Sequence, residues 1–163
     1  MFPEGSDQPA AMLALIPESD PMLERYLRPA AEWATVTPVV LPGFDTPSDV
    51  RRQLRKGVDS TRQRKLLEEV SRRIDGLLRK AITQAGFSEE LAGHAELEWR
   101  KTGFWAGVEL AERYGVPDHL KRFPRYHVRV RWHDSAGREV KLPGPVCFGG
   151  GRFYGAGLFA GMT

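Results

Sequence analysis

Apolar residues recur every three or four positions between Leu66 and Ala85, which is the longest regular pattern in the chain. This spacing is typical of an amphipathic α-helix, in which such positions share one face. Asp59 or Ser60 can cap the start of this helix, and Gly86 can end it. The sequence therefore predicts one long helix over residues 59–85. Its apolar face would contain Leu66, Leu67, Val70, Ile74, Leu77, Leu78, Ala81, Ile82 and Ala85.

A second pattern is the strict alternation of polar and apolar residues over residues 125–133, RYHVRVRWH. Alternation with a period of two indicates a half-buried β-strand. A similar alternation over residues 95–100 and a run rich in β-branched residues over 34–41 predict two more strands. Pro38 has no backbone N–H to donate, so it predicts an edge position or a bulge in the 34–41 strand. In the 125–133 strand, one face would carry Tyr126, Val128, Val130 and Trp132.

Weaker patterns fill the rest of the chain. They predict short helices over residues 21–31, 46–55 and 108–114, a turn after Ser88, a hairpin partner over 139–142 and terminal strands. The order of strands and helices matches an α+β fold, a ferredoxin-like (RRM-like) sandwich, with only a weak signal for the second helix of that plan. We expect residues 1–20 to be a poorly ordered lead-in and residues 21–163 to form a single domain.

Charge is distributed unevenly. The net charge is only +3, but residues 51–80 contain eight Arg and three Lys against four acidic residues. Such segregation predicts a polyanionic partner. On the long helix the cations lie opposite the apolar face. The alternative is a solvated surface in which ion pairs form along the helix. The helical cations are Arg62, Lys65, Arg72, Arg73, Arg79 and Lys80, and the candidate pairs are Arg64–Glu68, Lys65–Glu69 and Glu69–Arg73.

The polar face of the 125–133 strand is also basic, and it carries Arg125, His127, Arg129, Arg131 and His133. We expect this face to be accessible, either as a solvated surface or as a contact for phosphates. Bases of single-stranded RNA stack on aromatic side chains. Because the aromatic residues of this strand point to its other face, phosphate contact is favoured over base stacking.

The last twenty residues, Gly144 to Thr163, contain seven glycines. They lack the Gly-Lys-Ser/Thr ending of a phosphate-binding Walker loop and the glycine spacing of a dinucleotide fingerprint. Two interpretations stay open. The glycines let backbone N–H groups approach a ligand closely, or they form a tight hairpin in a packed terminus.

Several classes of protein are excluded or disfavoured. No segment approaches the ~20 apolar residues of a membrane span, and the N-terminus lacks the basic start of a secretory signal. The single Cys147 excludes an internal disulfide framework and a multi-cysteine zinc site. The histidines show no metal-binding spacing. We expect a cytoplasmic protein with no metal, no cofactor and no membrane partner.

Three segments together resemble a known family. They are WATVTPVVLPGFD (33–45), YGVPDHLKRFPRYHVRVRW (114–132) and LPGPVCFGGGRFYGAGLF (142–159). Over about residues 12–160 the chain is similar to the C-terminal half of the fused backbone-cap and crRNA-processing subunit of type I-G (formerly I-U) CRISPR systems, a member of the RAMP superfamily. The N-terminal half of that fusion precedes the resemblance. We expect this chain to be an excised domain or the product of a split gene.

The resemblance implies an RNA partner. Processing members of this superfamily have ferredoxin-like folds and cut CRISPR repeat RNA without a metal. The RNA 2′-hydroxyl attacks the adjacent phosphorus and leaves a 2′,3′-cyclic phosphate and a 5′-hydroxyl. Some close relatives have histidine at the position of Phe153, and in many the catalytic histidine lies in the half that is missing here. The family's glycine-rich loop is matched by Gly149, Gly151, Arg152, Gly155 and Gly157.

These observations predict a metal-independent endoribonuclease of a type I effector complex. Its partners would be repeat RNA, the other subunits of the complex and the missing cap half. His127 is the first candidate for the general acid or base and Tyr154 the second, and the glycine-loop amides would stabilise the phosphorane. The alternatives are a non-catalytic RNA-binding cap and a small DNA-binding regulator. The phosphate ligands would be Arg62, Arg72, Arg73 and Arg79 on the helix, Arg129 and Arg131 on the strand, and Arg152 in the loop, all lining one groove.

Overall fold

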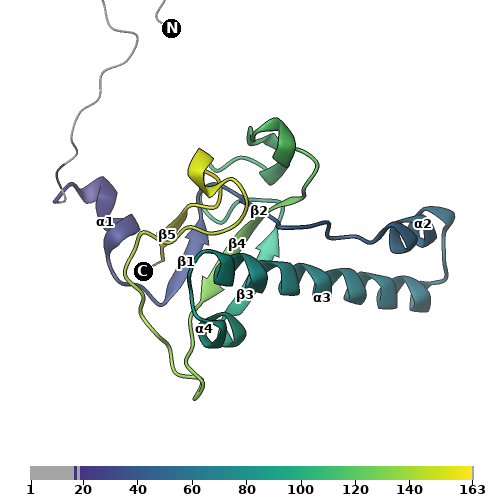
Figure 1. The fold of residues 1–163 in the computed structure, drawn as a ribbon, viewed down its shortest axis with the longest axis horizontal. Coiled ribbons are helices and arrows are strands. Elements are labelled where there is room, and N and C mark those ends of the chain that lie inside the picture. The colour runs from purple at the N-terminus through teal and green to yellow at the C-terminus, as the bar shows by residue number, and fades with distance from the viewer. Residues whose placement is uncertain (1–16, 18, 163) are drawn as a thin grey trace, which may run out of the picture.

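Five strands form an antiparallel sheet, and helices cover one of its faces (Figure 1). The computed structural model describes residue 17 and residues 19–162, so the predicted lead-in over 1–20 lies almost entirely outside the described residues. The strands are β1 (Glu32–Thr35), β2 (Val39–Val40), β3 (Glu96–Arg100), β4 (Arg125–Arg131) and β5 (Phe159–Gly161). The helices are α1 (Pro21–Leu27), α2 (Ser48–Lys56), α3 (Ser60–Gln84) and α4 (Glu89–His94), with 3₁₀ turns η1 (Ala111–Arg113), η2 (Asp118–Leu120) and η3 (Arg152–Tyr154).

The central strand of the sheet is β4. It pairs with β3 along one edge, and along its other edge with β1 and, further on, β2. β5 then pairs with β1. The succession of β1 and β2, α3, β3, β4 and β5 follows the ferredoxin-like βαββαβ plan. The second helix of that plan is missing, because residues 132–158, all of them described, contain only the 3₁₀ turn η3. The expected α+β, RRM-like fold is therefore confirmed.

The predicted 34–41 strand is interrupted. β1 ends at Thr35 and β2 begins at Val39, and Pro38 lies in the break. The Thr35 side-chain oxygen accepts the hydrogen bond of the Val128 N–H (2.9 Å), which bridges the interruption. Two other predicted elements are shorter in the structure than the sequence suggested. The helix expected over 108–114 is only η1, and the hairpin partner over 139–142 forms isolated bridges instead of a strand.

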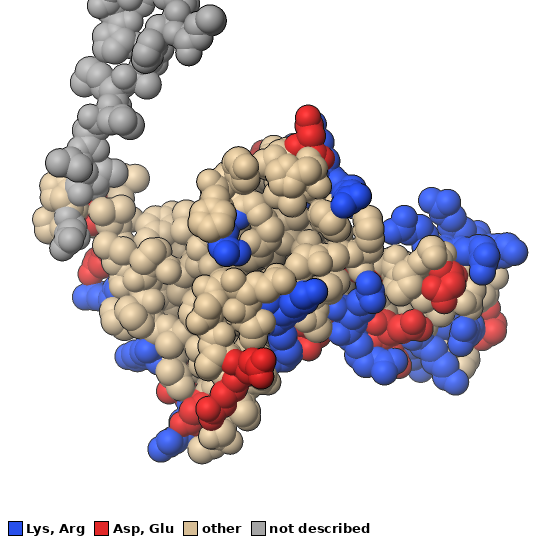
Figure 2. All heavy atoms as spheres, in the orientation of Figure 1, with Lys and Arg blue, Asp and Glu red and all other residues tan. Residues whose placement is uncertain are grey.

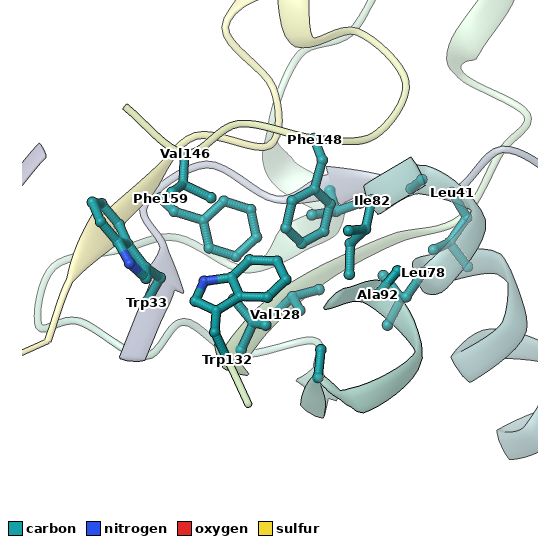
Figure 3. Close-up of a cluster of buried hydrophobic side chains, with 14 of the residues drawn as sticks. Trp33, Leu41, Leu78, Ile82, Ala92, Val128, Trp132, Val146, Phe148 and Phe159 are labelled. Atoms are coloured by element: carbon teal, nitrogen blue, oxygen red, sulfur yellow. The ribbon is translucent and has the colours of Figure 1, made fainter. Parts of the chain in front are cut away.

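The hydrophobic core lies between the sheet and the second half of α3 (Figure 3). Val128, Val130 and Trp132 are fully buried, as the alternation in the 125–133 segment predicted. Ile74, Leu78 and Ile82 of α3 pack against them, and Phe148 and Phe159 from the glycine-rich terminus complete the cluster. Burying each of these side chains contributes about 1.5–3 kcal/mol to folding, so α3 is held firmly at this end.

The first half of α3 extends beyond the sheet (Figure 1). At 1.5 Å per residue, its 25 residues make a helix about 38 Å long. Asp59 caps its start by accepting from the Arg62 N–H (2.9 Å), and α2 lies beside this half. We call residues 48–73, which comprise α2 and the first half of α3, the helical arm. Leu67, predicted on the buried face, is 52% exposed because no sheet lies under this part of the helix.

Candidate nucleic-acid interface

The helical arm gathers positive charge on its surface. It carries nine cationic residues against four acidic ones, and all nine are exposed. Figure 2 shows these Lys and Arg side chains crowded over α2 and the first half of α3. The cations are Arg51, Arg52, Arg55, Lys56, Arg62, Arg64, Lys65, Arg72 and Arg73.

The arm's cations are not neutralised within the fold. The ion pairs between described residues all lie outside the arm. The three pairs that would have made this a self-compensated surface, Arg64–Glu68, Lys65–Glu69 and Glu69–Arg73, are not among them. The guanidinium and ammonium groups of the arm are therefore available to an external anion.

The position of these cations on α3 also works against helix stability. Arg62, Arg64 and Lys65 lie in the first two turns, and the first turn contains no acidic residue. Cations near a helix N-terminus oppose the helix dipole, at a cost of about 0.3–1 kcal/mol each. An anion bound across these turns would remove that cost. Asp59 at the N-cap offsets part of this cost, and a bound anion would offset more of it.

The predicted phosphate ligands on α3 have different surroundings. Arg72 is exposed, and no hydrogen bond of its side chain to a described residue is found. Arg62 donates to Gln53 of α2 (2.8 Å), and Arg73 donates to the Phe44 carbonyl (2.6 Å). Each of these bonds uses only some of the five N–H donors of a guanidinium. All three side chains can still bind phosphate.

Arg79 has a structural role instead. Its guanidinium binds the Asp75 carboxylate (2.7 Å) and also donates to the carbonyls of Ala92 and Gly93 at the end of α4. Only 30% of its side chain is exposed. These contacts fasten α4 to α3 and leave few donors for a ligand.

The expectation of an accessible basic face on β4 holds only in part, because its arginines are half-buried and paired with acidic residues. Arg131 binds Glu32 (3.1 Å), and Arg129 binds both Glu32 (3.5 Å) and Glu98. These acids come from β1 and β3, whose registers place Glu32 and Glu98 beside the arginines. Glu32 raises the pKa of Arg131 through its hydrogen bond and its charge. The arginines of β4 thus belong to a cross-strand ion-pair network.

His127 lies on the same face of β4 but is completely buried. The segment of residues 101–114 covers it, and the Tyr114 ring packs edge-on against the imidazole (5.8 Å). Nε2 lies 2.9 Å from the Glu109 carbonyl, which can only accept, so Nε2 carries the proton. Nδ1 then accepts from the Thr35 hydroxyl (3.1 Å). Burial lowers the pKa of His127 below its usual value, and the ring is a neutral, fully bonded core group.

The sheet separates two of the surfaces that the sequence placed in one groove. Val128 and Val130 face α3, so Arg129 and Arg131, which alternate with them, face the opposite side. The prediction that the helix, the β4 arginines and the glycine loop converge is therefore wrong for β4. The helical arm and the glycine loop remain as candidate surfaces.

Two of the loop glycines are required by packing within the chain. A Cβ atom on Gly149 would lie 2.6 Å from the Val39 side chain, and one on Gly157 would lie 2.0 Å from the Phe148 carbonyl oxygen. The Gly157 N–H donates to the Pro38 carbonyl (2.9 Å). At these positions the close backbone approach is to the protein itself. The tight hairpin, one of the two interpretations of this segment, accounts for them.

The other two predicted glycines frame a projecting turn. Gly151 (φ 76°) and Gly155 (φ 82°) are both left-handed and flank η3. This turn presents Phe153 and Tyr154, which are 86% and 69% exposed, with Arg152 beside them. Phe153 was not a candidate site residue, because exposure cannot be deduced from a pattern of glycines.

A histidine that was not among the predicted site residues also lies here. The ring of His119, in η2, packs edge-on against Tyr154 with centroids 6.4 Å apart, and His119 is exposed. Its only signal in the sequence was its place within the second motif of the family resemblance, residues 114–132. The pair brings a phenol and an imidazole together on the surface of the glycine loop.

Other candidate chemistry is sparse. Within residues 17 and 19–162, no group of three or more His, Cys, Asp or Glu is arranged to hold a metal ion. Cys147 is half-buried, and burial raises the pKa of its thiol, which disfavours a nucleophilic role. Of the described helices, none combines the length and the apolar composition that crossing a bilayer requires.

Residues 4–161 match the family model described as "CRISPR-associated protein, GSU0054 family". The match spans nearly the whole chain. No curated protein and no solved structure gives a significant match.

Proposed function

Because the chain belongs to the GSU0054 family of CRISPR-associated proteins, we propose that it is the subunit of a type I CRISPR effector complex that binds the structured repeat RNA of the crRNA. It corresponds to the C-terminal half of the fused cap and processing subunit that its motifs resemble. The observation that carries this proposal is the helical arm, with its nine exposed cations and no internal ion pair.

The arm suits an RNA backbone better than the edges of bases. The part of α3 in the arm, residues 60–73, is a helix about 21 Å long along which cations are spaced, and arginine matches phosphate through its planar, forked donors. Contacts of this kind fix the position of the RNA without reading its sequence. Recognition of one particular repeat therefore depends on other parts of the protein or on the shape of the RNA.

Metal-independent cleavage of the repeat is the second candidate function. The buried His127 cannot reach a phosphate in this conformation, so the chemistry would rely on the exposed Tyr154 and His119 beside the glycine loop. One group would take the proton of the attacking RNA 2′-hydroxyl, and the other would protonate the departing 5′-oxygen. The phosphorus–oxygen bond to that 5′-oxygen breaks as the bond to the 2′-oxygen forms. The products are a 2′,3′-cyclic phosphate and a 5′-hydroxyl.

One experiment tests binding and cleavage together. The full chain is mixed with a fluorescently labelled repeat hairpin RNA in EDTA, binding is followed by anisotropy, and products are separated on a denaturing gel. Salt-dependent binding is expected. A cyclic-phosphate product that is lost in Tyr154→Phe or His119→Ala would establish the nuclease, and an intact RNA would leave the non-catalytic cap. Failure to bind the hairpin, or tighter binding to duplex DNA, would contradict the proposal.

The role of the arm is tested by a matched pair of triple variants. Replacing Arg62, Arg64 and Arg72 with Gln removes three charges from the arm. Replacing Arg28, Arg113 and Arg138 with Gln removes three charges from exposed residues whose partners are acidic side chains elsewhere. Each charge-assisted contact contributes about 1.5–3 kcal/mol. The arm variant should therefore bind RNA about 100-fold or more weakly, and the control should bind almost as the wild type does.

A further inference from the structure

We propose that unpaired nucleotides adjoining the RNA stem follow a path from the helical arm to the glycine loop, where their bases stack on Phe153 and Tyr154. This inference rests on the proposed function, since it assumes that the stem is held by the arm. It adds a second site with a different chemistry, which recognises single-stranded RNA.

The aromatic pair is presented by a rigid support. The Gly151 carbonyl accepts from the N–H groups of Tyr154 (2.8 Å) and Ala156 (3.1 Å), which closes the turn on itself. The Thr37 hydroxyl donates to the Gly155 carbonyl (2.7 Å) and ties the turn to the segment between β1 and β2. Phe153 is 86% exposed on this turn, so it adds little to the packing of the described residues. The ring face that Arg152 does not cover is open to a planar ligand.

Positive charge accompanies the aromatic rings. The Arg152 guanidinium lies 4.8 Å from the centre of the Phe153 ring. On the other side of the turn, the imidazole of His119 meets the edge of Tyr154. Proteins that bind single-stranded nucleic acid combine stacking rings with cations that hold the intervening phosphates. Arg152 is in position to supply that charge next to a base stacked on Phe153.

Contacts between segments connect this site to the arm. Leu120 of η2 touches the glycine loop, where its side chain would lie 3.1 Å from a Cβ on Gly151. Just beyond η2, the Arg122 guanidinium lies 4.9 Å from the Phe123 ring. Cations and aromatic rings thus alternate along this segment too.

The path then reaches the arm through Phe44. Its ring packs against Phe123 with centroids 5.3 Å apart and is 44% exposed. The Phe44 carbonyl accepts from Arg73 of the arm. A strand leaving the arm at Arg73 would therefore pass over Phe44 and Phe123 before it reaches Tyr154.

The opposite face of the sheet is closed to bases. In RRM domains, aromatic residues on the sheet stack with single-stranded RNA. Here residues 101–114 cover one part of that face, where Trp105 donates to the Ala34 carbonyl (3.1 Å). The ion pairs of Glu32 with Arg129 and Arg131 occupy another part. Exposed aromatic rings are found on the glycine loop instead, which favours the loop as the site for bases.

The test compares two RNA probes. One is a blunt-ended hairpin, and the other is the same hairpin with an unpaired flank on each side that contains 2-aminopurine, a base whose fluorescence is quenched by stacking. The wild-type protein should bind the flanked probe more tightly and quench its fluorescence. Phe153→Leu and Tyr154→Leu retain an apolar side chain but remove the ring, so each should weaken binding of the flanked probe about 10-fold and abolish most of the quenching.

Two further variants sharpen the result. Phe153→Trp keeps an aromatic face and should retain both affinity and quenching. Met22→Ala shortens another exposed apolar side chain, on α1, and should change neither. The Phe153 variants and Met22→Ala should bind the blunt hairpin as the wild type does, because the arm is intact.

The possible outcomes separate this inference from the proposed function. If neither probe binds, the proposed function fails. If both probes bind but Phe153→Leu and Tyr154→Leu change neither affinity nor quenching, RNA binding stands and the stacking site is overturned. In that case the exposed rings would be a contact for another protein subunit.

Discussion

Two groups of arginines in this fold differ in their exposure and in their acidic partners. Those of the helical arm are exposed and without acidic partners, whereas Arg129 and Arg131 of β4 are bound to Glu32, Glu96 and Glu98. Both groups looked like phosphate ligands in the sequence. The comparison shows that the neighbours of a basic segment, more than its own composition, decide whether its charge is available to a ligand.

The cause of the difference is geometric. In a sheet every central strand has two neighbours, and antiparallel pairing brings opposite charges on adjacent strands within reach of each other. The first half of α3 instead projects beyond the sheet (Figure 1), and the helix beside it, α2, is itself basic (Figure 2). The account therefore predicts that substitutions on the sheet face change stability and that substitutions on the arm change RNA binding.

The largest effect on stability is expected for His127→Ala. It would leave a cavity in the core and remove the hydrogen bonds to Thr35 and the Glu109 carbonyl. The free energy of unfolding should fall by about 3 kcal/mol, measured by urea denaturation. RNA affinity of the folded fraction should be unchanged. A selective loss of RNA cleavage in a fully folded variant would restore His127 as a catalytic candidate.

The next effect compares two arginines of α3. Arg79→Gln removes the contacts that fasten α4, so the free energy of unfolding should fall by about 2 kcal/mol. Arg72→Gln removes an exposed cation and should change stability by less than about 0.5 kcal/mol. For RNA affinity the order should reverse, so that Arg72→Gln weakens binding more than Arg79→Gln does. Thermal unfolding and anisotropy on both variants check this, and equal effects of the two on RNA binding would contradict the distinction.

The sequence predicted some of these features and not others. The periods of α3, β3 and β4 were strong, so the existence of these elements and the buried positions of Val128, Val130 and Trp132 followed directly. The burial of His127 could not be predicted, because the 101–114 segment that covers it has only a weak pattern over 108–114, which does not show where the segment packs. The ion pairs of Arg129 and Arg131 depend on the register of β1 and β3, which alternation alone does not fix.

The glycine-rich terminus shows the same limit. Its composition indicated close backbone approach, and the structure has it at Gly149 and Gly157. A sequence cannot tell whether a ligand or the protein itself makes that approach. The exposure of Phe153 follows from the direction of η3, which a list of residue types does not contain.

A smaller effect is expected for Glu32→Gln. This change removes the carboxylate shared by Arg129 and Arg131 but leaves them Glu98 and Glu96. Because the network is partly exposed, the free energy of unfolding should fall by only about 1 kcal/mol. A large gain in RNA affinity on this substitution would mean that the β4 face is a latent phosphate site, which would weaken the contrast with the arm.

The smallest effect concerns pH. Burial lowers the pKa of His127 in the folded state, so below about pH 6.5 the unfolded chain binds a proton that the folded chain does not. The free energy of unfolding is therefore unaffected by His127 above about pH 6.5, and it decreases as the pH falls below that value. This decrease amounts to at most about 1.4 kcal/mol per pH unit. His127→Gln should make the fall in stability between about pH 6.5 and 5 shallower in urea denaturation, and an unchanged slope would contradict the buried neutral ring.

The central claim, that the helical arm holds RNA through its phosphates, is tested most directly by the salt dependence of binding. The slope of log affinity against log salt concentration counts the phosphate contacts, at about 0.7–0.9 per contact. For the arm variant with Arg62, Arg64 and Arg72 replaced by Gln, the slope should fall by about 2–3 relative to wild type. The control with Arg28, Arg113 and Arg138 replaced should keep the wild-type slope. Equal slopes for the wild type and the arm variant would contradict the account.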